Sequence, residues 1–182
     1  MKSPTHPIPL PDTYWVLPGR MLAGEHPCGA DEAETRSRLD CLRAAGIDYF
    51  IDLTEVHEMI DYHGLLPRDA VYLRCAIPDT WVPENPAQMH ELQSRIRAAL
   101  ILDRHIYVHC RAGIGRTGVV IGCYLAEENL DGKAALKRLN GLWRQSARAK
   151  TWPKVPQTVE QAEYIRRWPK HRKSLLSQRI DS

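Results

Sequence analysis

The sequence predicts an α/β domain with a central, mostly parallel sheet flanked by helices. Short apolar segments typical of strands alternate along the chain with longer amphipathic segments typical of helices. The chain has 182 residues and no internal repeat, a length that fits one domain with its own hydrophobic core. These observations favour a single layered domain.

The predicted strands are short apolar runs bounded by turn residues. The first two flank Pro18 and Gly19, a dipeptide typical of turns. The run from Ile47 to Leu53 is mostly apolar, as expected of a buried strand. The predicted strands comprise residues 14–17, 21–23, 47–53, 71–77 and 105–109.

The predicted helices have apolar residues at helical spacing. Met89, Leu92 and Ile96 fall on one face, and Gly46 is a plausible end for the first helix. Pro156 is expected near the start of the last helix. The predicted helices comprise residues 31–45, 87–100, 119–127, 133–143 and 156–168.

Composition excludes several protein classes. The five cysteines are odd in number and form no CxxC pair, which argues against a disulfide scaffold or a zinc site. We expect no metal and no cofactor. No apolar run approaches membrane-spanning length, so we expect a protein of the reducing cytoplasm. The net charge of +3 agrees with an anionic substrate, and the basic run 170–173 reads as a solvated tail rather than a nucleic-acid site.

The most informative segment runs from His109 to Gly118, where a predicted strand ends and a predicted helix begins. Two glycines let the backbone curl, so that consecutive N–H groups can surround an anion at the helix N-terminus. The positive potential there favours the thiolate of Cys110, the expected nucleophile. Arg116 can hold two phosphate oxygens with its planar fork, and the Thr117 hydroxyl is placed to donate to the sulfur. The alternative is a buried structural cysteine beside incidental glycines.

This segment resembles the His-Cys-x5-Arg-Ser/Thr-Gly signature of the cysteine-based protein tyrosine phosphatase superfamily, and the chain is similar to its compact dual-specificity members. The resemblance implies a phosphate monoester hydrolase that works through a cysteinyl-phosphate intermediate. It also implies a phosphate-binding loop, to which we assign Arg111, Ala112, Gly113, Ile114, Gly115 and Arg116.

A carboxylic acid is expected to reach the same pocket, because the leaving oxygen needs a proton. The resemblance implies that this acid lies upstream of the cysteine. The superfamily carries this acid on a loop, and the segment from Pro78 to Pro83 resembles it, with Asp79 as the acid. The alternative for Asp79 is an ordinary turn residue. Trp81 is expected either to cover an aromatic substrate ring or simply to pack within the protein.

A downstream segment, residues 157–161, resembles the QTxxQ loop of the larger tyrosine-specific phosphatases. The resemblance implies that Gln157 orients a water molecule and that Gln161 contacts the phosphate pocket. The alternative is a helix start with surface glutamines. Glu55 is a candidate to form an ion pair with Arg116 or Arg111. The simpler interpretation is that Glu55 lies on the surface.

The expected substrate is a phosphorylated protein or a small phosphate ester, and several alternatives stay open. The chain lacks the Lys-Asn-Arg-Tyr recognition segment of the large tyrosine-specific enzymes, which leaves phosphotyrosine, dual and lipid specificity unresolved. The resemblance implies lysines in this loop for the lipid phosphatases of the superfamily, so Ile114 argues against an inositol lipid. The alternatives are a phosphatase of phosphoinositides, RNA 5′-phosphates or other non-protein phosphate esters, and a non-catalytic phosphate-binding module. Redox roles for Cys75 and Cys123, and the oligomeric state, are likewise open.

The expected organisation has three parts. Residues 1–12 form an extended leader, residues 13–170 the phosphatase domain, and residues 171–182 a basic C-terminal tail.

Overall fold

A computed structural model describes residues 6–128 and 131–180 of the chain, and strands and helices alternate along this part. All ten predicted strands and helices are confirmed. Their bounds are β1 (Thr13–Leu17), β2 (Met21–Gly24), α1 (Glu32–Ala44), β3 (Tyr49–Asp52), β4 (Val71–Arg74), α2 (Pro86–Ile101), β5 (Ile106–His109), α3 (Arg116–Glu127), α4 (Gly132–Trp143) and α5 (Val159–Ile180). Two short 3-10 helices, η1 (His63–Leu65) and η2 (Ala147–Lys150), complete the described elements.

The sheet has the strand order β1-β2-β5-β3-β4. Only β1 runs antiparallel to its neighbour, so the prediction of a mostly parallel sheet is confirmed. Strand β5 lies in the middle, with His109 in register with Gly24 on one side and Asp52 on the other. The loops that follow β2, β3 and β5 therefore emerge side by side at one edge of the sheet, where ligand sites of open parallel sheets lie.

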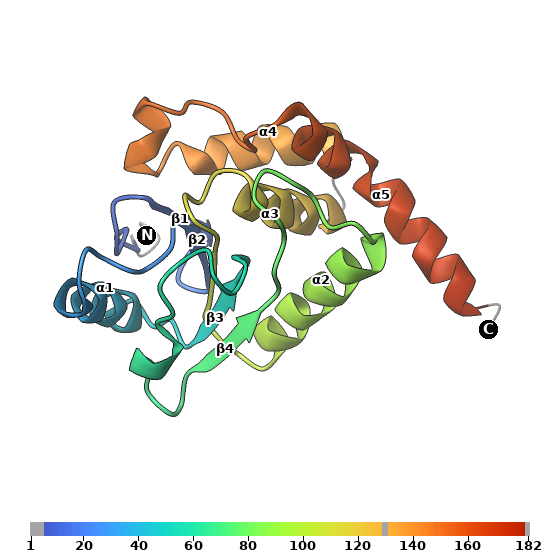
Figure 1. Ribbon diagram of the computed structural model, residues 1–182. Helices are drawn as coiled ribbons and strands as arrows, with labels where there is room; N and C mark the ends of the chain where they lie inside the picture. Colours follow the sequence, from blue (N-terminus) through green and yellow to red (C-terminus); the bar gives the residue numbers. More distant parts are fainter. Residues whose placement is uncertain (1–5, 129–130, 181–182) are drawn as a thin grey trace, which may run out of the picture.

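Side chains of the central strands alternate between two apolar clusters, as the period of a strand requires. On β5, Ile106 and Val108 belong to the larger cluster, which is completed by α2, α3, α4 and α5. Tyr107 faces the smaller cluster, which includes Leu39 and Leu42 of α1. Helix α1 thus covers one face of the sheet and the other helices gather on the opposite face (Figure 1).

The helix ends follow from local sequence. The Asp31 carboxylate accepts the N–H of Glu34 at 2.8 Å and caps α1, whose end is followed by Gly46 at a φ of +93°. Asn85 caps α2 in the same way, and a proline occupies the first turn of that helix. Helix α3 begins at Arg116, earlier than expected, because the phosphate loop leads directly into it.

The expected boundary at residue 170 falls inside α5, which continues to Ile180. Pro169 is accommodated within this helix, and no glycine follows it to end the helix earlier. At the other end, residues 1–5 of the expected leader lie outside the described residues, and Leu10 is buried in the smaller apolar cluster. No helix in the described part of the chain is both long and apolar enough to cross a bilayer.

Candidate active site

The loop from Cys110 to Gly115 joins β5 to α3 at the centre of the sheet edge. Cys110 is buried, with 3% of its surface exposed. Gly113 has a φ of +74°, and a methyl group added there would lie 2.5 Å from the carbonyl carbon of Gly24. Any larger residue at this position would meet both backbone strain and a clash with the end of β2. The tight curl predicted from the glycines is therefore present.

Two carbonyl oxygens of this loop bind groups outside it. The N–H of His26 donates to the carbonyl of Arg111 at 3.1 Å, and the guanidinium of Arg148 donates to the carbonyl of Ala112 at 3.0 Å. Arg148 is itself held by the carboxylates of Asp12 and Glu25, both at 2.8 Å. Carbonyls held from outside are the arrangement expected of a loop whose N–H groups converge on an anion.

Arg116, the first residue of α3, is 1% exposed and is held by Glu58. The two guanidinium NH2 nitrogens donate to the two carboxylate oxygens of Glu58, at 2.6 and 2.5 Å, which is the bidentate geometry of the strongest ion pairs. One of these nitrogens also donates to the carbonyl of Ile77 at 3.1 Å. The orientation of the guanidinium is therefore fixed before any ligand binds.

The charges around Arg116 explain its ionisation. Burial opposes the guanidinium charge, but the hydrogen bond with Glu58 and the electrostatic interactions with Cys110, Glu58 and Asp79 outweigh it, so the pKa of Arg116 is raised. The same hydrogen bond lowers the pKa of Glu58. A permanently charged guanidinium beside Cys110 is what an anion site requires.

Asp79 lies on the loop between β4 and α2 and reaches the same guanidinium. Its carboxylate oxygen is 3.0 Å from a nitrogen of Arg116, while about half of its side chain (49%) remains exposed. The N–H of Thr80 donates to this carboxylate at 3.0 Å, with Thr80 at a φ of +65°. The acid loop and the phosphate loop, distant in sequence, therefore meet at Arg116.

The glutamine segment also meets the phosphate loop. A methyl group added at Gly115 would lie 3.0 Å from the side-chain amide of Gln161 and 3.1 Å from that of Gln157. Gln161 is fully buried, accepts the N–H of Gln157 at 3.1 Å and donates to the carbonyl of Trp81 at 3.1 Å. It thus ties the acid loop to the start of α5.

The remaining predicted site residues lie in different settings. Thr117 is buried, and its hydroxyl hydrogen bond goes to the carbonyl of Gly24 at 3.5 Å rather than to the sulfur. Ile114 is buried in the larger apolar cluster, whereas the side chain of Arg111 is exposed. Trp81 is 65% exposed and is not part of either apolar cluster.

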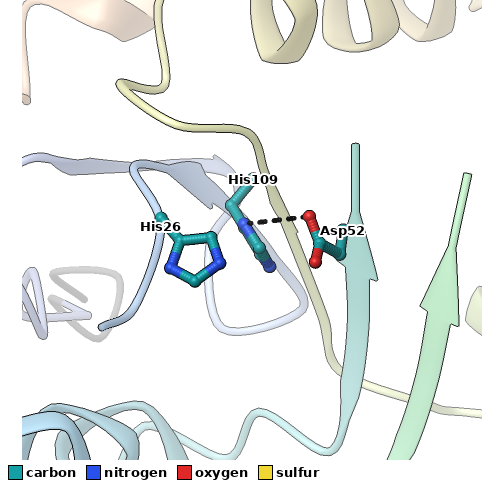
Figure 2. A group of neighbouring side chains, drawn as sticks. All are labelled: His26, Asp52 and His109. Carbon is teal, nitrogen blue, oxygen red and sulfur yellow. Dashed lines mark ion pairs between the residues drawn. The ribbon is translucent and has the colours of Figure 1, made fainter. Parts of the chain in front are cut away.

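Beneath the nucleophile, His109 belongs to a buried polar group with His26 and Asp52 (Figure 2). Burial lowers the pKa of His109 to about 3, so its ring is neutral at pH 7. Its Nδ1 faces the carbonyl of Cys110 at 3.4 Å and a carboxylate oxygen of Asp52 at 3.9 Å. Two acceptors on this side place the proton on Nδ1, and Nε2 then accepts from the hydroxyl of Tyr62 at 2.5 Å.

This group is the candidate metal cluster of the described residues, and its hydrogen bonds argue against that use. Donors occupy both oxygens of Asp52: Thr54 through its N–H and hydroxyl on one, Tyr72 and Arg74 on the other. These contacts leave the carboxylate no free direction for a cation. The group instead supports the floor of the phosphate loop.

A family model described as "Tc-R-P: Polymorphic toxin system, DSP-PTPase phosphatase" matches residues 27–129, more than half of the chain. The chain belongs to this family. The matched part of this DSP-PTPase contains Asp79, Cys110 and Arg116, and it ends before Gln157 and Gln161. The resemblance drawn from the loop signature is confirmed.

Curated relatives carry a related description. "Putative tyrosine phosphatase 067L" of Invertebrate iridescent virus 3 is 36% identical over 92 residues, which are 47% of this chain and 36% of the viral protein. "Putative tyrosine phosphatase 197R" of Invertebrate iridescent virus 6 is 27% identical over 94 residues, 50% of this chain and 35% of the viral protein. The matched part of the DSP-PTPase chain thus spans about a third of the length of these relatives.

Solved structures share the fold. Tk-PTP, in a mutant form, superposes with a TM-score of 0.71 at 24% identity, covering 90% of this chain and 98% of the other. Kinase associated phosphatase with its catalytic site cysteine replaced by serine gives a TM-score of 0.66 at 16% identity, covering 82% of this chain and 85% of the other. At these identities the likeness establishes the DSP-PTPase fold alone.

Sequence reasoning missed two residues that organise the site. Glu58, rather than Glu55, holds Arg116; Glu55 is exposed, in agreement with the simpler interpretation of that residue. Arg148, outside the family match, anchors the phosphate loop from η2. An acidic loop after β3 was a usable signal for Glu58, but its sequence does not distinguish the two glutamates.

The cysteines outside the phosphate loop are all free. Cys123 is buried on α3, and Cys75 is partly buried with its sulfur 3.9 Å from the side-chain amide of Gln88. Burial raises the pKa of both thiols, which makes them poorer nucleophiles at neutral pH.

Proposed function

We propose that this protein hydrolyses phosphate monoesters, with Cys110 as the nucleophile and phosphotyrosine in proteins as the preferred substrate. One observation carries the proposal. Asp79, a residue far upstream of Cys110, lies 3.0 Å from Arg116, the residue that closes the phosphate loop. A nucleophile, a cation and an acid then share one site, which is the set that this reaction needs.

In the first step the sulfur of Cys110 attacks phosphorus while the ester oxygen leaves. Arg116 and the loop N–H groups hold the phosphoryl oxygens, and their charge stabilises the transition state. Asp79, in its protonated form, gives its proton to the leaving oxygen and becomes a carboxylate. The side chain must move off Arg116 to take up this proton from water and to reach the leaving oxygen, and its half-exposed position allows this movement.

In the second step a water molecule attacks the cysteinyl-phosphate and the sulfur leaves as thiolate. Asp79 now takes a proton from the water. Gln157, which faces Gly115, is proposed to orient this water, and Gln161 to keep the acid loop and the glutamine segment together. A shift of the Thr117 hydroxyl from Gly24 toward the sulfur would ease the departure of the thiolate.

The test begins with Cys110→Ser. Hydrolysis of p-nitrophenyl phosphate and of a phosphotyrosine peptide should fall by at least about 10³-fold, with the circular dichroism spectrum unchanged. Cys41→Ser is the matched control, because Cys41 is an exposed cysteine on α1, outside the phosphate loop, and this variant should keep full activity. Full activity in Cys110→Ser would end the proposal. Absence of turnover in the wild type, with phosphopeptide binding retained, would instead identify a binding module.

Substrate choice is decided by comparing kcat/KM across phosphotyrosine, phosphoserine and phosphothreonine peptides, a phosphoinositide and an RNA 5′-phosphate. A phosphoinositide belongs in the panel because one structural neighbour, PTPMT1, has been solved in complex with PI(5)P. A higher kcat/KM for any non-protein substrate would overturn the preference for phosphotyrosine while leaving the reaction chemistry intact.

A further inference from the structure

A groove of about 920 Å³ runs beside the phosphate loop, between α4, the segment 151–158 and the start of α5. Its walls are largely apolar, and the side chains of Leu136, Val155 and Pro156 contribute to them. None of the site residues Cys110, Arg116 or Asp79 lines it, so it is a separate feature of the surface.

The groove is basic. Four basic residues line it and no acidic residue does: Lys137, Arg144, Lys154 and Arg166. They come from three different parts of its rim and all are exposed. Arg166 pairs with Glu163 at 3.2 Å, whereas Lys137, Arg144 and Lys154 make no ion pair with the described residues. An uncompensated cluster of this kind attracts separate negative charges.

The groove lies next to the candidate active site. Gln157 lines it and also faces Gly115 of the phosphate loop. Its neighbour Pro156 lies against the helix that follows the loop, where a methyl group on Gly118 would be 3.2 Å from it. The groove and the phosphate loop are therefore neighbours that share the segment with Pro156 and Gln157.

Exposed apolar residues accompany the groove and the site. In the groove, Trp152 is 41% exposed and Val159 is 76% exposed. Around the site, Trp81 is 65% exposed, and Val56 and Ile60 flank Glu58 with 60% and 67% of their surfaces exposed. Large apolar side chains near an active site indicate a surface that meets another macromolecule.

We propose that this groove binds acidic side chains that flank the phosphorylated residue of a protein substrate. The inference rests on the proposed function and adds the class of sequence that the enzyme selects. A peptide fits the groove better than a lipid headgroup or a nucleic acid does. Its acidic side chains are spaced along a chain, and its apolar side chains match the apolar walls. A lipid headgroup would call for basic groups around one point, and single-stranded nucleic acid for several stacking platforms, whereas Trp152 is the one aromatic residue in the described lining.

The experiment compares two phosphotyrosine peptides that differ only in their flanks, one with glutamates and one with glutamines. Wild-type kcat/KM should be roughly tenfold higher for the acidic peptide, and added salt should reduce this ratio. In the variant Lys137→Glu/Arg144→Glu/Lys154→Glu the ratio should fall to one or below. A ratio that persists in this variant overturns the proposal, as does a wild-type ratio of one.

The matched control is Lys133→Glu/Arg138→Glu/Lys150→Glu. It changes the same residue types and the same net charge at exposed positions that do not line the groove, and it should keep the wild-type ratio. Loss of the ratio in this control as well would show a general charge effect and overturn the groove assignment.

A binding measurement separates this inference from the proposed function. Fluorescence anisotropy with the unphosphorylated acidic peptide requires no chemistry, and only the groove variant should bind it more weakly. If the wild type fails to hydrolyse p-nitrophenyl phosphate yet binds this peptide, the proposed function fails and the groove remains. If the groove variant loses affinity for phosphoinositide vesicles or single-stranded RNA but not for the peptide, the peptide assignment is wrong.

Discussion

The phosphate loop and the acid loop meet at Arg116 but are held in different ways. The phosphate loop is buried from Gly113 onward, curls at Gly113 and is fixed from outside by Arg148 and from below by His109. The part of the acid loop around Asp79 lies on the surface and joins the rest of the site through one ion pair and one hydrogen bond from Gln161, while Val82 packs against the larger apolar cluster. A rigid seat for the phosphate combines with a donor that is free to move, as two-step proton transfer requires.

The difference implies that substitutions in the two loops should separate activity from stability. Changes in the acid loop should slow the reaction with little effect on unfolding. Changes in the phosphate loop should reduce both.

The largest expected effect is that of Asp79→Asn, which tests the acid loop. Turnover of a phosphotyrosine peptide should fall by about 10²- to 10⁴-fold, because the leaving oxygen no longer receives a proton. Activated aryl phosphates, which leave easily, should slow far less, and the melting temperature should stay unchanged. The measurement is kcat/KM across leaving groups of graded basicity, with Glu84→Gln as a control at an exposed carboxylate of the same loop. Equal slowing of all substrates would identify another residue as the acid.

Gly113→Ala tests the phosphate loop. The added methyl group would lie 2.5 Å from the backbone of β2 at a φ of +74°, so the variant should lose about 2–4 kcal/mol of stability together with activity. Gly141→Ala is the matched control, because nothing lies within 4 Å of a methyl group there. Because residue 141 lies within a helix, Gly141→Ala should increase the free energy of unfolding by up to about 1 kcal/mol. Urea denaturation measures the stability of both variants. A Gly113→Ala variant with wild-type stability would contradict the view that the phosphate loop is held more rigidly than the acid loop.

A third test concerns the buried histidines under the phosphate loop. Burial lowers the pKa of His26 to about 4 and that of His109 to about 3. Each folded-state pKa lies below the ordinary value of 6.5, so between pH 6.5 and about 4 the unfolded chain takes up protons that the folded chain refuses. The free energy of unfolding should therefore decrease as the pH is lowered through this window. The slope should reach at most about 2.7 kcal/mol per pH unit for the two histidines together.

Urea midpoints measured from pH 7 to pH 4.5 check this dependence. His57→Gln should leave the slope as in the wild type, because His57 is exposed. Replacing His26 by phenylalanine should reduce the slope by about half. A flat profile in the wild type would mean that the two rings are not held neutral by burial.

How far the sequence alone reaches depends on the range of each interaction. The strands and helices follow from local periodicity, and the loop signature identifies Cys110 and Arg116, because one short segment holds the whole phosphate cradle. The family resemblance led us to expect Asp79 at the phosphate pocket, and its carboxylate lies 3.0 Å from Arg116.

The choice of Glu58 over Glu55, the anchor Arg148 and the hydrogen bonds under His109 depended on tertiary structure. Each pairs residues that are distant in the chain, and no local pattern distinguishes a carboxylate that reaches the guanidinium from one that faces water. The basic groove is of the same kind, because its charged residues are scattered along the sequence and gather only when α4 packs against α5. The sequence by itself therefore determined the residues of the phosphate loop, which are close together in the chain. Tertiary packing determined which distant side chains complete the site.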